Sequence, residues 1–392
     1  MSSSVRKSEF GLVSDTHFAG ESFTEQSPEY MRTSFAAAIT MGFVQGRFFR
    51  DAKLYCLNLL LTYADGCVGR CAYCGLSRTR EDSLSWRERS FIRVDWPIFK
   101  TDEIMNRIGS ETCSHVERVC VSMITHRRAP RDTLSIIRRL HDKMEAISAL
   151  ITPTIVDKGW LLEAKEAGAD KVGIAIDAAT PELFHKLRGR GVSGPHKWER
   201  YWRAVQEGIE IFGRHNVGIH LIVGLGETER EMIEIIQMAY DKGALSHLFS
   251  FFPEQGSLMH RHKQPPVGSY RRVQLARYLI NKGMTCADKM GFDGNGRVVD
   301  FGLDDSVLHD AINSGMPFVI SGCSTKRMEN ACNRPFSDST PYQAYIGELR
   351  NFPFIPDEKD VSIAKRQLGD YSDRPPRVWI DDIGCENCLD II

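Results

Sequence analysis

The sequence predicts an α/β protein built on a partial barrel of six parallel strands, a (β/α)6 fold. Between residues 54 and 252, six apolar runs typical of buried strands alternate with stretches of helical periodicity, which is the order that produces parallel βα units. A cysteine-rich loop, Cys67-Val-Gly-Arg-Cys71-Ala-Tyr-Cys74, directly follows the first run. Ligands of parallel barrels gather at the carboxyl ends of the strands, so the loop lies where a site is expected.

The elements follow one another in a regular order. We expect strands at 54–62, 116–123, 149–154, 171–176, 217–223 and 246–251, and helices between them at 132–146, 159–167, 197–212 and 227–242. A further helix at 270–282 and short strands near 291–301 and 317–320 extend this core. The predicted domains are a helical N-terminal extension (1–50), the barrel (51–320) and a loop-rich C-terminal region (321–392) with its own cysteines.

Composition limits the classes of function. The chain has 392 residues, 42% of them hydrophobic, and a net charge of −1, which gives no sign of a nucleic-acid or membrane partner. There is no run of 18 apolar residues and no apolar signal core at the N-terminus, so we expect a cytoplasmic protein. Eleven cysteines in a reducing compartment favour metal ligation over disulfides.

The CxxxCxxC spacing of Cys67, Cys71 and Cys74 suits a four-iron cluster, because three thiolates hold three irons and leave the fourth open to a small ligand. The alternatives are a zinc knot and chance clustering. Zinc sites usually take four ligands from paired CxxC units. A fourth nearby cysteine is missing here unless Cys56, within the first predicted strand, serves.

A second cysteine set lies in the C-terminal region and consists of Cys323, Cys332, Cys385 and Cys388. We expect it to hold a second, auxiliary [4Fe-4S] cluster, since two pairs from separate segments can fold around one metal centre that fastens a loop-rich tail. The open alternatives are a structural zinc site, unliganded thiols, and a hydroxyl of Ser337 or Ser339 in place of one thiolate.

The cysteine loop resembles that of radical S-adenosylmethionine (SAM) enzymes. Residues 219–228, with Gly224-Leu-Gly226-Glu227, resemble the Gly-Leu-Gly-Glu strand of the biotin synthase and lipoyl synthase branch, and residues 171–184 are similar to its fourth strand. The resemblance implies a cluster that binds SAM, with Asp177 on the ribose hydroxyls and Arg188 or Arg190 on the SAM carboxylate. The other implied contacts are Tyr73, Ser122, Gly224, Glu227 and Phe252. Asp177 as a helix cap and the arginines as solvated surface are the structural alternatives.

Departures from the family pattern show which members of this branch the chain resembles most. Biotin synthases carry cluster cysteines on the second, third and fifth strands; here Cys120 fits the second, but Ile151 and Gly218 stand at the others. Methylornithine synthase has no second cluster, so the tail cysteines argue against it. The tail Cys323…Cys332-Asn-Arg-Pro-Phe336 resembles the biotin-synthase-like components of two-protein lipoyl synthases.

This resemblance implies sulfur insertion into a protein-bound octanoyl chain, with Cys67, Cys71, Cys74, Cys323 and Cys332 as catalytic residues. The implied partners are a second radical SAM lipoyl synthase component, an octanoylated lipoyl-carrier protein and an electron donor such as ferredoxin. A second hypothesis is a rearrangement or cofactor-maturation enzyme, similar to methylornithine synthase, whose second cluster transfers electrons or is structural. A third is a zinc-stabilised binding module without catalysis.

Overall fold

The computed structural model describes residues 25–80, 84–85, 88–91, 94–334 and 338–373. In this part of the chain one eight-stranded sheet has the order β3-β1-β2-β4-β5-β6-β7-β8. Neighbouring strands from β2 to β8 are parallel, so the predicted six-stranded partial barrel is confirmed. These strands are β2 (Cys56–Leu61), β4 (Arg118–Ser122), β5 (Ile147–Ile151), β6 (Lys171–Asp177), β7 (Val217–Val223) and β8 (Leu245–Ser250).

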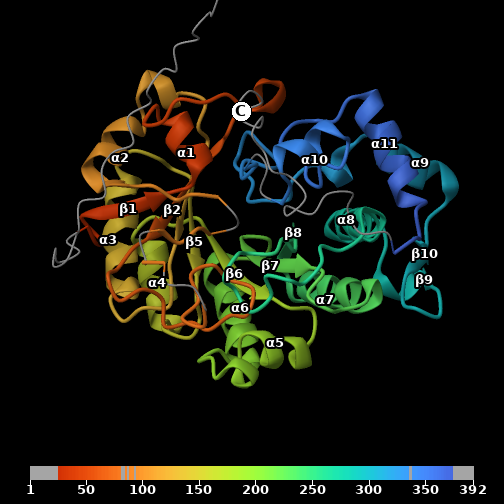
Figure 1. Ribbon diagram of the computed structural model, residues 1–392, viewed down its shortest axis with the longest axis horizontal. Helices are drawn as coiled ribbons and strands as arrows, with labels where there is room; N and C mark the ends of the chain where they lie inside the picture. Colours follow the sequence, from red (N-terminus) through yellow and green to blue (C-terminus); the bar gives the residue numbers. More distant parts are fainter. Residues whose placement is uncertain (1–24, 81–83, 86–87, 92–93, 335–337, 374–392) are drawn as a thin grey trace, which may run out of the picture.

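Helices cover the outer face of the curved sheet (Figure 1). They are α3 (Ala129–His141), α4 (Lys158–Glu166), α5 (Pro181–Leu187), α6 (Trp198–Phe212), α7 (Glu229–Lys242) and α8 (Val267–Asn281). All six residues of β2 are buried, because one face meets the helices and the other faces the barrel interior. This is why the strand reads as a continuous apolar run instead of an alternating one.

Buried polar contacts fix the helices that lead into the C-terminal part. Helix α7 starts with a capping box between Thr228 and Glu231. Glu229, the first residue of α7, accepts a hydrogen bond from Nη2 of Arg272 on α8 at 2.6 Å, and both side chains are at most 4% exposed. Glu229 also accepts from the Val298 N–H at 2.9 Å, so this carboxylate joins α7, α8 and β10 (Val298–Asp300).

The N-terminal part differs from the helical extension that we expected. Residues Tyr30–Thr33 form β1, which pairs antiparallel with β2 and with β3 (Ile98–Lys100). Among the described residues of this part, the helices are the short α1 (Phe35–Thr40) and α2 (Thr101–Arg107) and a 3-10 turn at Phe49–Asp51. The physical reason is the open edge of β2: a strand there satisfies the backbone groups that a helix would leave unpaired.

The C-terminal part packs beside the barrel and then enters it. It contains β9 (Gly291–Phe292), which pairs with β10, and α9 (Asp305–Asn313), α10 (Pro341–Tyr345) and α11 (Glu358–Leu368). The short strand expected at 317–320 is instead a 3-10 turn, Met316–Phe318, followed by a single bridge from Val319 to Phe352. Among the described residues, no helix is both long and apolar enough to span a membrane.

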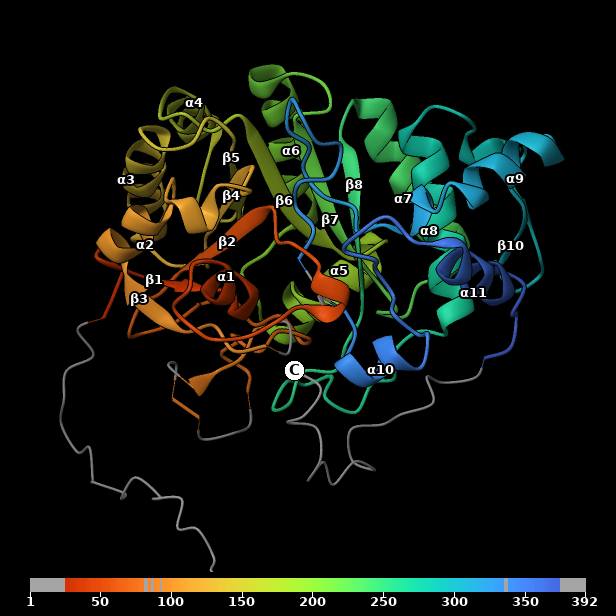
Figure 2. The same cartoon turned by 90° about the horizontal axis from the view of Figure 1, so that it is seen from above.

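Residues 321–334, the inserted loop, run between the two edges of the parallel strands (Figure 2). The Ser321 hydroxyl accepts a hydrogen bond from the Leu248 N–H of β8 at 2.8 Å. At the other end, the Asn333 carbonyl oxygen accepts one from the Tyr55 N–H, just before β2, at 2.9 Å. The inserted loop thus crosses the gap that six strands leave in an incomplete barrel.

Candidate functional site: two cysteine sets in one cavity

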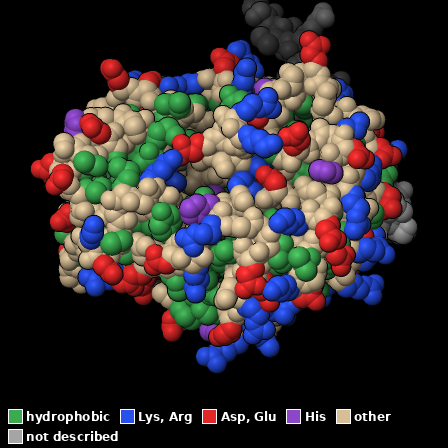
Figure 3. Space-filling model, turned by 180° about the vertical axis from the view of Figure 1, so that it is seen from behind, with side chains coloured by type: hydrophobic (Ala, Val, Ile, Leu, Met, Phe, Trp, Pro, Cys, Tyr) green, Lys and Arg blue, Asp and Glu red, His purple; other side chains and the backbone are tan. Residues whose placement is uncertain are grey.

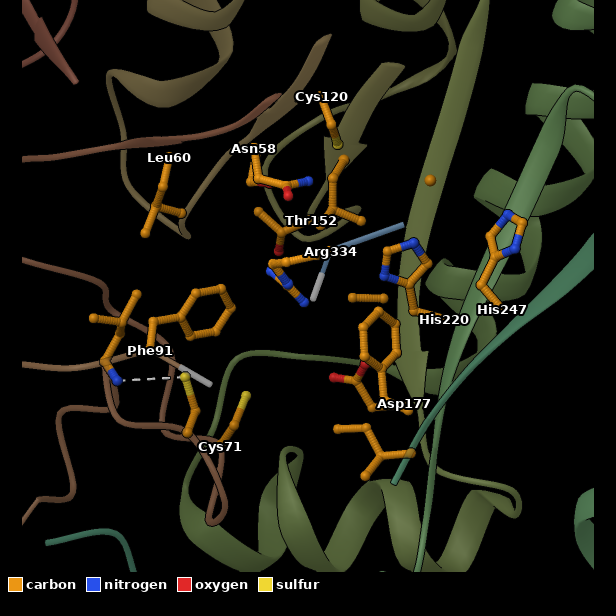
Figure 4. A pocket seen from close by; sticks show the side chains of 18 of the residues that line it. Asn58, Leu60, Cys71, Phe91, Cys120, Thr152, Asp177, His220, His247 and Arg334 are labelled. Carbon is orange, nitrogen blue, oxygen red and sulfur yellow. Dashed lines mark hydrogen bonds between the residues drawn. The ribbon is translucent and has the colours of Figure 1, made fainter. Parts of the chain in front are cut away.

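One cavity of about 250 Å³ occupies the barrel interior. Figure 4 shows that Cys71 and Cys120 lie at opposite ends of it, with Asn58, Thr152 and Arg334 between them. Seen from behind, the molecular surface is hollowed near its centre, with charged side chains and a histidine around the hollow (Figure 3). The cavity runs from the carboxyl ends of the strands, where the cysteine loop lies, toward their amino ends.

The loop cysteines Cys67, Cys71 and Cys74 all line the first end of the cavity. Backbone N–H groups point at two of the sulfurs: Gly69 donates to Cys67 at 3.2 Å and Leu76 to Cys74 at 3.4 Å. Burial raises the pKa of all three thiols, that of Cys71 to about 11. Three thiols in one half-buried loop, two of them with amide donors that stabilise thiolates, fit a cluster held by three cysteines.

Asp177 ends β6 in a left-handed backbone conformation, at φ 67°. Its Oδ2 accepts hydrogen bonds from the Tyr73 hydroxyl at 2.5 Å and from Nη1 of Arg188 at 2.6 Å. Arg188 also donates to the carbonyls of Ala175 and Ile176 and to the Tyr201 hydroxyl. With a side chain only 4% exposed, Arg188 is a buried group that holds the strand end in place, not solvated surface.

The other expected SAM contacts divide into two groups. Ser122 and Phe252 line the cavity. Gly224 and Glu227 lie just after β7 and outside the cavity lining, and the Glu227 carboxylate accepts from the Gly224 N–H at 2.6 Å and the Leu225 N–H at 3.0 Å. Arg190 is exposed and also lies outside the lining.

Cys323 and Cys332 lie at the far end of the cavity, where Cys56 of β2 and Cys120 of β4 join them. We call these four residues the inner cysteines. From the sequence we expected Cys385 and Cys388 as the companions of Cys323 and Cys332, but Cys385 and Cys388 lie outside the described residues. Local sequence patterns did not place Cys56 and Cys120 beside Cys323 and Cys332, because β2 and β4 are buried along their whole length and show no alternation.

Hydrogen bonds connect the inner cysteines. The Cys332 sulfur accepts one from Asn58 Nδ2 at 3.9 Å, and the interaction with the neighbouring Cys56 thiol lowers the pKa of Cys332 and raises that of Cys56. The Cys323 carbonyl accepts from the Cys332 N–H at 3.3 Å. Burial raises the pKa of Cys120 and of Cys323. Among the described cysteines none forms a disulfide, so these thiols are available as ligands.

Two histidines line the wall between the two ends of the cavity. His220 of β7 and His247 of β8 have ring centroids 5.7 Å apart, and both face the cavity (Figure 4). Burial lowers the pKa of His220 to about 4 and that of His247 well below its ordinary value, so both are neutral at pH 7. The two neutral imidazole rings can therefore make hydrogen bonds to a ligand without adding charge to this wall.

Part of the chain is similar in sequence to known proteins. Residues 61–239 match the radical SAM superfamily. Over 251 residues, or 61% of this chain, the sequence is 21% identical to 3-methylornithine synthase of Methanosarcina acetivorans, of which it spans 64%. Over 88 residues, or 22% of this chain, it is 22% identical to GTP 3',8-cyclase of Acaryochloris marina, of which it spans 26%. The chain thus spans less than two thirds of either relative.

The crystal structure of HydG, a maturase of the [FeFe]-hydrogenase, superposes on this chain with a TM-score of 0.47 and 13% sequence identity, over 85% of this chain and 84% of that chain.

Proposed function

We propose that this chain, a radical SAM enzyme, forms a carbon radical on a substrate held in the barrel cavity between the loop cysteines and the inner cysteines. The observation that carries the proposal is the position of Cys67, Cys71 and Cys74, which follow β2 and face that cavity. When bound there, a four-iron cluster supplies the electron that cleaves SAM to a 5′-deoxyadenosyl radical.

The chain's own residues position and shield the reactants. Tyr73 and Arg188 hold the Asp177 carboxylate at the mouth, next to the loop cysteines, where a hydroxylated ligand can donate hydrogen bonds to it. The neutral histidines His220 and His247 and the apolar strand residues enclose the space beyond. Enclosure matters because a primary carbon radical must meet its substrate before it meets water or another side chain.

For the fate of the substrate radical, we place a carbon-skeleton rearrangement or a cofactor-maturation reaction first. This choice is supported by the relative that spans most of this chain, which is named 3-methylornithine synthase. The second set of cysteines would then serve electron transfer or structure.

Sulfur insertion into a protein-bound octanoyl chain is a second candidate, because one specific observation favours it. Cys323 and Cys332 face the same cavity as the loop cysteines, so a sulfur source held there would share the substrate's chamber. This candidate requires an octanoylated carrier protein and a second lipoyl synthase component as partners. Both candidates need an electron donor such as ferredoxin.

The test is SAM cleavage by the anaerobically reconstituted protein with dithionite, measured as 5′-deoxyadenosine by liquid chromatography. We expect cleavage by the wild type and by Cys113→Ala, a buried cysteine that does not line the cavity, and none by Cys71→Ala. A zinc-loaded wild type without cleavage would overturn the proposal. Incubation with an octanoylated carrier domain separates the two fates, since a mass gain of sulfur supports insertion and its absence supports rearrangement or maturation.

A further inference from the structure

We infer that Cys56, Cys120, Cys323 and Cys332 together bind a polynuclear iron–sulfur cluster at the amino-terminal end of the barrel cavity. This site differs from the tail site that pairs Cys323 and Cys332 with Cys385 and Cys388. The inference concerns metal binding alone, so it stands or falls independently of what the substrate radical becomes.

Strand register brings the first two ligands to one face. In the parallel pair β2 and β4, Cys56 is aligned with Arg118, and Asn58 with Cys120. Side chains two residues apart on a strand share a face, so both cysteines belong to the row that faces the interior. Both of them line the cavity, as does Asn58 between them.

The inserted loop supplies the other two ligands in a fixed conformation. The Cys323 carbonyl accepts from the N–H groups of Ala331 and Cys332, which closes the loop on itself. Gly322 packs so closely on Cys332 that a Cβ at Gly322 would lie 2.3 Å from the Cys332 carbonyl oxygen. Asn333, the next residue, donates from its side chain to the carbonyls of Lys53 and Pro353 at 2.7 and 2.9 Å.

A buried cation ties the loop to the strand that carries Cys120. Arg118 is fully buried, makes a two-pronged ion pair with Asp170 at 2.6 Å and donates to the Ser324 carbonyl at 2.6 Å. Because Asp170 already compensates the charge of Arg118, the cavity-lining Arg334 is the cation that can balance thiolates at this end. A cation beside the four thiols suits thiolates bound to a metal centre.

Several buried polar atoms at this end have no hydrogen-bond partner among the residues that the structure describes. They are Asn58 Oδ1, Arg118 Nε and Arg334 Nε, on side chains that are at most 9% exposed. Figure 4 shows Asn58 and Arg334 directed into the cavity below Cys120. Buried groups of this kind are normally satisfied, so their position beside the thiols indicates a missing bound group.

Four thiols can hold either a cluster or a single metal ion. Within the described residues, no group of three His, Cys, Asp or Glu side chains is arranged as a site for a metal ion. The same holds for the loop cysteines, which nevertheless have the spacing of a four-iron cluster ligand set. In a cluster each thiolate binds its own iron, so the sulfurs stand farther apart than around one zinc.

The experiment measures iron and acid-labile sulfide per chain after anaerobic reconstitution of full-length protein. We expect about eight irons in the wild type and about four in Cys56→Ala/Cys120→Ala, whereas Cys385→Ala/Cys388→Ala keeps about eight. Electron paramagnetic resonance of the dithionite-reduced double variant, with and without SAM, checks that its remaining cluster still responds to SAM. That response separates loss of the inner site from loss of the radical SAM centre.

Two glycine variants provide a matched control that keeps every cysteine. In Gly322→Ala the added methyl group would clash with the Cys332 carbonyl oxygen and push the two ends of the inserted loop apart, so iron should fall to about four. Gly294→Ala has open space around it and should change nothing. The inference is overturned if Cys385→Ala/Cys388→Ala loses the irons and Cys56→Ala/Cys120→Ala keeps them. It is equally overturned if the wild type binds only about four irons or carries zinc at the second site.

Discussion

Replacing Arg188 by methionine tests whether this arginine is a buried brace for Asp177. In the wild type the side chain is 4% exposed and donates to Asp177, to two strand carbonyls and to Tyr201. Arg188→Met leaves the Asp177 carboxylate without its cation. Removing one partner of a buried ion pair costs about 3–5 kcal/mol, because a desolvated charge remains.

The cost converts into a measurable melting shift. An unfolding entropy of about 2.1 cal/mol/K per residue gives about 0.8 kcal/mol/K for this chain if it unfolds as one unit. Arg188→Met should therefore lower the melting temperature by about 4–6 °C in differential scanning fluorimetry without SAM. The exposed neighbour Arg190 provides the control, since Arg190→Met should shift it by less than about 1 °C.

A double variant identifies why Arg188→Met lowers the melting temperature. Asp177→Asn/Arg188→Met removes the uncompensated charge and should regain at least about 1 °C over Arg188→Met alone, because residues in contact couple strongly. Equal melting temperatures for Arg188→Met and Arg190→Met would refute the brace. If Arg188 instead acts only by holding SAM, its replacement would weaken SAM binding without changing the stability of the SAM-free protein.

Three further predictions follow from buried polar groups. Glu229→Gln breaks the ion pair with Arg272 and should cost about 3–5 kcal/mol of unfolding free energy, whereas the exposed Glu234→Gln on the same helix should cost less than about 0.5 kcal/mol in the same urea titration. Asn333→Ala removes three hydrogen bonds and should cost about 2–3 kcal/mol, and the variant should lose iron faster than wild type when challenged with a chelator. Burial keeps His220 neutral down to a pKa of about 4 against an ordinary 6.5. The unfolded chain binds that proton first, so stability falls as pH drops from 6.5 toward 4, by up to about 1.4 kcal/mol per pH unit. His220→Asn should flatten this dependence in melting curves between pH 7 and pH 5, and an unchanged slope would contradict it.

The sequence predicted the regular part of the molecule well, because the signals there are local. All six parallel strands were expected within a few residues, and β7 was predicted with the bounds it has, Val217–Val223. The cysteine loop was recognisable for the same reason, since its spacing needs no knowledge of the fold. Strand β1 was missed because only the free edge of β2 makes Tyr30–Thr33 extended.

Contacts between segments far apart in the sequence decide which residues line the far end of the cavity, and local sequence patterns do not reveal such contacts. A strand buried on both faces, such as β2, shows no alternation that tells which side chains face inward. Cys56 therefore looked like an ordinary core residue, and Cys120 like a remnant of another family's ligand set. The entry of residues 321–334 into the barrel depends on partners far away in sequence, such as Tyr55 and Arg118.

The inserted loop also has a consequence for the order of folding. Its contacts join residues separated by 206 positions, from Arg118 to Ser324, and by 278, from Tyr55 to Asn333. Closing such long loops is entropically costly and gains nothing until β2 and β4 already exist, so the segment docks late. Until then the amino-terminal end of the barrel stays open to solvent. A large inorganic group can therefore reach that end of the barrel during biogenesis only before the segment docks.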